Sequence, residues 1–262
     1  MVDAVAGSPA FSIGRVSSMT FAVIGRNLVP FLIVTVIAVL PQEIAAQLFV
    51  QSTLVMGKPD PAKFLSAVYW ISFFGLELVS VILAFLLQAA LMHGTIVDLN
   101  GQKVSIGDAL STSLRAFWPL LGLAIVSSMG IGLGLIFLVF PGLMLAMAWA
   151  VGVPVLVVEH KGVLDSLSRS GDLTRGSRWP IFGLAAIFYV GAATLGATVK
   201  PLMGLSILSP QVPTFSILYV LVDGAVRSMT SLVGSIGIAC IYYELRTSKE
   251  GIGPQQLASV FD

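Results

Sequence analysis

The stretch from Phe117 to Val158 constrains the fold most, because its 42 residues contain no charged side chain. A helix needs roughly 20 apolar residues to cross a hydrocarbon core of about 30 Å. The stretch therefore predicts two membrane-spanning helices in succession. We place the break between them at Pro141-Gly142 rather than at the glycines of 130–134, because Pro and Gly together end one helix and open the next.

The rest of the chain has the same character, with 56% hydrophobic and only 10% charged residues. Soluble domains carry about 25% charged residues, so much of this chain must have a bilayer as its solvent. We predict an all-α integral membrane protein in which residues 1–262 form a single membrane domain. Together with the two spans above, four further apolar runs give six transmembrane helices: Leu28–Val50, Leu65–Val97, Pro180–Val199 and Ile217–Tyr243.

Composition also excludes some classes of partner. The formal net charge is +1, which gives no electrostatic reason for binding nucleic acid. The single Cys240 rules out an internal disulfide and any site built from several cysteines. We therefore expect no cofactor, no metal and no nucleic-acid partner.

Lys and Arg residues indicate the orientation, because they accumulate on the cytoplasmic side of short loops. With six spans both termini lie on one side, and that side receives ten Lys and Arg against three on the other. We therefore expect both termini in the cytoplasm. The ten residues are Arg15, Arg26, Lys103, Arg115, Lys161, Arg169, Arg175, Arg178, Arg246 and Lys249.

A weak internal repeat runs through the chain. Ser12-Ile13-Gly14-Arg15-Val16 resembles Ser105-Ile106-Gly107-Asp108-Ala109, and the second, fourth and sixth spans end in the acids Asp98, Glu159 and Glu244. We predict three pseudo-repeated hairpins, each preceded by a cytoplasmic interfacial amphipathic helix. The units cover roughly 11–98, 104–159 and 163–245, followed by a short cytoplasmic tail at 246–262.

The segment 163–178 illustrates the predicted surface helices. Val163, Leu164, Leu167 and Leu173 recur near helical spacing with polar residues between them, which fits a helix in the membrane interface. Trp rings also favour the headgroup layer. The alternative is a loop helix that packs on its neighbours. The residues predicted to contact lipid are Arg169, Arg175, Arg178, Trp179 and Trp118.

Ionisable residues inside spans are candidates for a functional site, because each is costly to bury in lipid. Asp223 and Arg227 are four residues apart and so share one helix face, while Glu77 lies on the second span. The three side chains predict either an intramembrane polar site for a headgroup or ion, or a self-neutralising pair with Arg227 reaching outward. Glu43 is expected near the outer surface.

Two stretches also resemble a known family. Phe140-Pro141-Gly142 with Val153-Pro154-Val155-Leu156-Val157-Val158-Glu159, and Tyr242-Tyr243-Glu244-Leu245-Arg246 near the end, are similar to the membrane domain attached to some bacterial glycerophosphoryl diester phosphodiesterases. The resemblance implies a multi-span protein of the bacterial inner membrane. The phosphodiesterase itself is a separate barrel domain, and the six predicted spans leave no residues for it in this sequence. The membrane domain of the family has no agreed catalytic residues that could be assigned to positions in this chain.

The sequence contains no Walker motif, no His-Glu-x-x-His and no Gly-x-Ser-x-Gly. We therefore expect a non-enzymatic inner-membrane protein that organises or binds membrane partners or lipids. The alternative is a small transporter or lipid-handling carrier that uses Asp223, Arg227 and Glu77. Membrane lipids are the expected partners, with other membrane proteins as further candidates.

Overall fold

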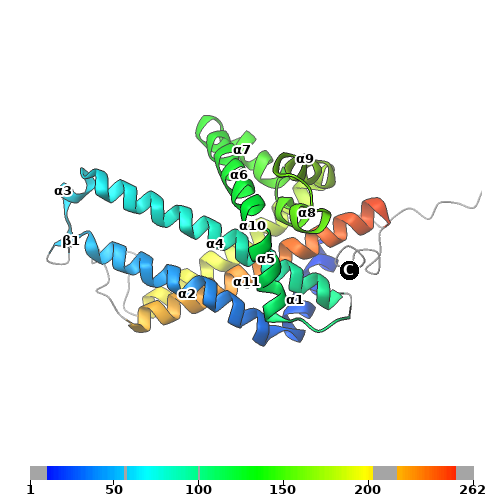
Figure 1. The fold of residues 1–262 in the computed structure, drawn as a ribbon, viewed down its shortest axis with the longest axis horizontal. Helices are drawn as coiled ribbons and strands as arrows, with labels where there is room; N and C mark the ends of the chain where they lie inside the picture. The colour runs from blue at the N-terminus through cyan, green and yellow to red at the C-terminus, as the bar shows by residue number, and fades with distance from the viewer. Residues whose placement is uncertain (1–10, 56–57, 100, 203–216, 252–262) are drawn as a thin grey trace, which may run out of the picture.

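The computed structural model describes residues 11–55, 58–99, 101–202 and 217–251, and these are almost entirely helical (Figure 1). Six helical segments among them are long and apolar enough to cross a membrane, which confirms the predicted class. Residues 1–10 and 252–262 of the predicted domain and tail lie outside the described part. The six segments are α2 (Leu28–Ser52), α4 (Ala67–Leu99), α6 (Phe117–Phe137), α7 with α8 (Val139–Glu159), α10 (Arg178–Leu202) and α11 (Ile217–Glu250).

Prolines set where several of these helices end. A proline has no N–H, and its ring clashes with the carbonyl four residues earlier, so the upstream helix stops there. α1 (Ile13–Arg26) ends four residues before Pro30, and α5 (Ile106–Arg115) ends four residues before Pro119. Each proline then occupies the third position of the next helix, where its missing N–H would have no intrahelical partner.

The same effect of proline explains why the predicted position of the break in the uncharged stretch is wrong. The break is not at Pro141-Gly142, because α6 already ends at Phe137, four residues before Pro141, and Leu138 is extended. A second, unpredicted interruption separates α7 (Val139–Ala148) from α8 (Gly152–Glu159). α7 ends six residues before Pro154, so this interruption does not have the one-turn spacing of the first.

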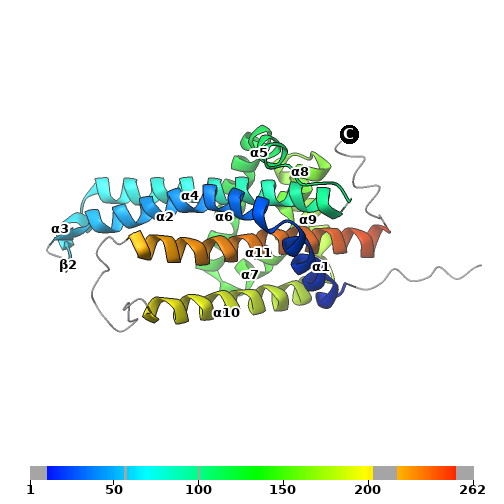
Figure 2. The same cartoon turned by 90° about the horizontal axis from the view of Figure 1, so that it is seen from below.

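The long helices form two groups. α2, α4 and α11 pack closely on one another, and α10 lies alongside α11 (Figure 2). The α6–α7 pair leaves this group at a steep angle (Figure 1). At one end of the long helices lie α1, α5, α8 and α9 (Val163–Thr174), which we call the α9 end. The opposite end, the strand end, carries β1 (Leu54–Val55), paired antiparallel with β2 (Lys58–Pro59), and α3 (Pro61–Phe64).

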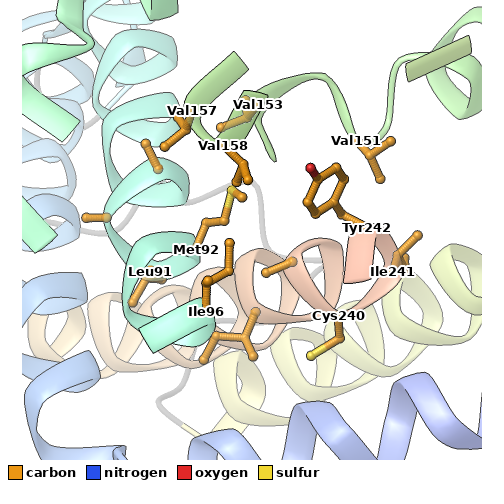
Figure 3. Packing of buried hydrophobic residues seen from close by; sticks show 14 of the residues in the cluster. Leu91, Met92, Ile96, Val151, Val153, Val157, Val158, Cys240, Ile241 and Tyr242 are labelled. Atoms are coloured by element: carbon orange, nitrogen blue, oxygen red, sulfur yellow. The ribbon is translucent and has the colours of Figure 1, made fainter. Parts of the chain in front are cut away.

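At the α9 end, part of the buried apolar cluster joins α4, α8 and α11 (Figure 3). Met92 from α4, Val158 from α8 and Tyr242 from α11 are all at most 1% exposed. Their close packing fixes α4, α8 and α11 relative to one another at the α9 end, because tightly interdigitated side chains leave little room for movement.

α9 binds directly to the interruption between α7 and α8. The Ser170 hydroxyl donates to the Ala148 carbonyl at 2.7 Å and accepts from the Val151 N–H at 3.2 Å. Thr174 adds a second hydroxyl to the same carbonyl at 3.3 Å. Ser170 is fully buried, so it satisfies backbone groups that the broken helix leaves open.

We expect Ser170→Ala to destabilise the protein by about 1–3 kcal/mol, because the Val151 N–H would lose its acceptor without gaining water. Ser168→Ala is the matched control, since Ser168 is exposed on the same helix. Thermal unfolding in detergent measures both. Equal midpoints for the two variants would contradict the bridging role of Ser170.

Candidate functional site

Three charged side chains meet between α2 and α11. Arg227 Nε lies 2.9 Å from Glu43 Oε2 and 3.2 Å from Asp223 Oδ2. The Glu43 and Asp223 side chains are only 5% and 9% exposed, whereas that of Arg227 is 61% exposed. Two nearly buried carboxylates thus share one guanidinium that also faces outward. We call these three residues the ion cluster.

The ion cluster lies deep along its helices. Arg227 is 17 residues from Glu244 on α11, which is about 25 Å at 1.5 Å per residue. Glu43 is 15 residues from the start of α2, about 22 Å by the same rise. Both distances are measured from the α9 end. Across a hydrocarbon core of about 30 Å, they place the ion cluster in the half of the bilayer nearer the strand end.

The ion cluster borders a cavity of about 480 Å³ between α2, α4, α10 and α11. α10 forms one wall through Phe188, Tyr189 and Ala192. Polar groups from the other three helices form much of the opposite side, which gives the cavity several hydrogen-bonding partners for a ligand. These groups are Gln42, Glu43, Gln88, Arg227, Thr230, Ser231 and Ser235.

An apolar pocket of about 280 Å³ continues from this cavity toward the α9 end. It lies between α1, α10 and α11, and its lining is almost wholly apolar. The two hollows share Phe188, Gly234 and Ile238 in their walls. We call the pair the lateral groove, polar at one end and apolar at the other.

The predicted third member of the site, Glu77, is not in the ion cluster. Glu77 is exposed on α4, and it lines neither part of the lateral groove. α4 contributes Ala84 to Gln88 instead, so Glu77 lies two helical turns further toward the strand end. The structure therefore brings Asp223 and Arg227 together as their spacing predicts, with Glu43 as the third residue.

Arg169, predicted to contact lipid, lies within a network of ion pairs. It pairs with Glu159 at 3.2 Å and with Glu250, while Glu159 also accepts from the Tyr242 hydroxyl at 3.2 Å. Burial lowers the pKa of the Arg169 guanidinium, but the hydrogen bond from Arg169 to Glu250 and the charges of both acids outweigh it and raise the pKa. Arg169 therefore stays charged and joins α8, α9 and α11.

The other four predicted lipid-contact residues surround the start of α6 and α10. Trp118 and Trp179 are 75% and 65% exposed, so both rings are available to a membrane interface. Arg175 is exposed, and its carbonyl accepts from Lys249. Arg178 is only partly exposed and donates to the Gly171 carbonyl at 3.5 Å. A lipid role for these residues stays a prediction.

The three acids that end the second, fourth and sixth predicted spans all accept ion pairs from short helices. Asp98 binds Arg26 at 2.6 Å, and Glu244 binds Arg15 of the same helix α1. Glu159 binds Arg169 of α9. These pairs attach α1 and α9 to the ends of the long helices.

Comparison with known protein families, with curated proteins and with solved structures finds no match for this chain. Within the described ranges, no three His, Cys, Asp or Glu side chains lie close enough together to hold a metal ion. The ion cluster and the lateral groove are therefore the candidate functional features of the chain.

Proposed function

We propose that this chain is a non-enzymatic integral membrane protein that binds an amphipathic membrane lipid along the lateral groove. One observation carries the proposal, namely that the polar cavity and the apolar pocket share Phe188, Gly234 and Ile238. A lipid has the same two parts in the same order, a polar headgroup joined to hydrocarbon. Ligand sites of this kind are mostly apolar with a few placed polar groups.

The depth of the ion cluster suggests which leaflet supplies the lipid. Arg227 and Glu43 lie in the half of the span nearer the strand end, and the apolar pocket lies nearer the α9 end. A headgroup from the leaflet at the strand end would meet the ion cluster, with its chain directed toward the bilayer centre. In the proposed orientation, with both termini cytoplasmic in a bacterial inner membrane, this is the outer leaflet.

The same proposal includes the finer architecture. α1, α5 and α9 each precede a long helix, which supports three units of a short helix and two spans. The pairing of Glu244 in the third unit with Arg15 in the first joins the ends of the series. We propose that these three helices lie in the cytoplasmic interface. The similarity to the phosphodiesterase-associated membrane domain agrees with this arrangement and stays a prediction.

A carrier function is the second candidate, and the position of the ion cluster at the polar cavity supports it. Arg227 and Glu43 both line that cavity, and the Arg227 side chain is largely exposed. A charged group of a substrate in the cavity would therefore meet ionisable side chains inside a span, which are costly to keep there without a function. Proteoliposomes that contain the protein should then show lipid scrambling or substrate uptake, and flux no higher than in empty vesicles would exclude this candidate.

Gly237→Leu tests the lipid-binding proposal. Gly237 lines the apolar pocket, and a Cβ there would meet no atom within 4 Å, so Leu fits the backbone and fills the pocket. Apolar contact worth about 1.5–3 kcal/mol would be lost to a bound chain. We therefore expect affinity for a phosphatidylglycerol–phosphatidylethanolamine mixture to fall about tenfold or more. Mass spectrometry of lipids retained in mild detergent measures it.

Gly191→Leu is the matched control, because Gly191 is exposed on α10, lies outside both hollows and also has open space around its Cβ. It should retain lipid as the native chain does. If Gly237→Leu and Gly191→Leu keep the same amount of lipid per protein, the lateral groove is not the binding site and the proposal fails.

A further inference from the structure

A second polar hollow, of about 430 Å³, lies at the α9 end, away from the lateral groove. It forms where α4, α5, α6 and α8 converge, and neither the ion cluster nor the apolar pocket shares a residue with it. We call it the cationic pocket. Its polar lining comes from His93, Thr112, Arg115, His160 and Lys161.

The charges around the cationic pocket are one-sided. The pocket is lined by the basic side chains Arg115 and Lys161 and by two histidines, and no Asp or Glu lines it. Throughout the part of the chain that the structure describes, no carboxylate pairs with Arg115. Arg115 is therefore available to a ligand anion.

Glu159 and Asp108, the acids that act on Lys161 and His93, are engaged elsewhere or stand outside the pocket. Glu159 lies 3.4 Å from Lys161, but it also pairs with Arg169 at 3.2 Å and accepts from the Tyr242 hydroxyl. One carboxylate thus serves several cations and neutralises Lys161 only in part. Asp108, whose charge acts on His93, is not a lining residue.

The start of α6 adds a partial positive charge, although α5 and α8 also end at the pocket. α6 begins inside the pocket, where Ala116 and Pro119 form part of the wall. Ala116 is the N-cap of α6 and has no side-chain acceptor for the first helical N–H groups. The start of a helix carries a partial positive charge, which favours an anion beside the two cations.

From these contacts we infer that the cationic pocket binds a phosphate group. Arg115 offers a planar fork of donors that matches phosphate oxygens, and Lys161 supplies a second charge from another element. The phosphate belongs either to an anionic phospholipid headgroup or to a free phosphate compound. The exposed ring of Trp118, in the first turn of α6, gives a lipid an adjoining apolar contact.

The test compares native protein with Arg115→Gln/Lys161→Gln in lipid nanodiscs of phosphatidylcholine, with and without phosphatidylglycerol, and in titrations with inorganic phosphate. We expect binding to weaken about tenfold or more in the double variant, because two charge-assisted contacts are removed. Lys103→Gln is the matched control, since Lys103 is an exposed cation at the same end that does not line the pocket. It should bind as the native chain does.

A second measurement uses only native protein, so it does not depend on a variant that folds. Acetylation of Lys161, followed by mass spectrometry, should slow when the pocket is occupied, whereas acetylation of Lys103 should not change. Protection by phosphatidylglycerol alone assigns the site to a lipid headgroup, and protection by inorganic phosphate as well assigns it to phosphate in general. Unchanged reactivity of Lys161 with both probes, or equal binding by native and double-variant protein, would overturn the inference.

Discussion

Arg227→Leu should destabilise the protein by about 3 kcal/mol, because Glu43 and Asp223 would lose the one guanidinium that both contact. Breaking a buried pair by removing one partner costs about 3–5 kcal/mol. We expect the lower end, since the Arg227 side chain is 61% exposed while the two acids are nearly buried. The same variant should retain less lipid per folded molecule. Thermal unfolding in detergent and mass spectrometry of retained lipid measure the two effects.

A double variant tests whether Glu43 and Arg227 are coupled, and a third acid serves as a control for position. Glu43→Gln combined with Arg227→Leu should recover part of the lost stability, because one of the two carboxylates that lost the guanidinium is then neutral. Glu77→Gln is the control for position, since Glu77 is exposed on α4 outside the ion cluster, and its effect should stay within about 0.5 kcal/mol. Strictly additive effects of Glu43→Gln and Arg227→Leu would show that the pair is not coupled.

The spans could be predicted well from the sequence because membrane thickness imposes a one-dimensional rule. An uncharged run of sufficient length must cross or enter the bilayer, whatever packs beside it. The predicted Leu28–Val50 therefore begins at the same residue as α2. The helix ends differ because polar residues extend α11 to Glu250, where Arg246 binds Glu250 at 2.8 Å.

The candidate site could be predicted only where its residues share one helix. The contact between Asp223 and Arg227 can be predicted from their four-residue spacing on α11. Glu43 comes from α2, and its contact with Arg227 depends on how two distant helices pack. The sequence does contain one indication of this contact. Glu43 and Arg227 are separated from the α9 ends of their helices by similar numbers of residues, so they lie at a similar depth. Glu77 qualifies as a candidate because it is an acid inside a span. In the structure, however, α4 reaches the polar cavity only from Ala84 onward, so Glu77 lies too near the strand end to join the ion cluster.

The helix break before Pro141 follows a local rule that can be read from sequence, whereas the angle of the α6–α7 pair cannot. α6 ends one turn upstream of Pro141, but α7 ends six residues upstream of Pro154, so only the first interruption follows this rule. The steep departure of α6–α7 depends on contacts with α4 and α9 that join distant parts of the chain. No periodicity within the uncharged stretch encodes those contacts.

The close approach of α6 and α7 depends on two glycines, one in each helix, on either side of the turn between them. A Cβ at Gly142 would lie 2.5 Å from the backbone nitrogen of Leu135, and one at Gly134 would lie 2.9 Å from Gly142 Cα. Small residues allow helix backbones to approach in lipid, where apolar burial does not by itself drive association. Because the obstacle is backbone, no side-chain rotation could make room for a larger residue.

We therefore expect Gly142→Val to separate α6 from α7 and to cost about 3 kcal/mol or more, at the upper end of overpacking effects. The unfolding midpoint should fall by roughly 6–12 °C. Gly132→Val is the matched control, because Gly132 lies on the same helix pair and a Cβ there meets nothing within 4 Å. A midpoint for Gly142→Val equal to that of Gly132→Val would mean that α6 and α7 do not approach as closely as described.

Gly142→Val also separates stability from lipid binding. Neither α6 nor α7 lines the lateral groove, so the folded fraction of this variant should retain the native amount of lipid. Gly237→Leu should do the opposite, losing lipid while its unfolding midpoint stays near the native value, because the added side chain meets open space. If both variants lost lipid in proportion to stability, retained lipid would report only how much protein is folded, and the lateral groove would have no specific role.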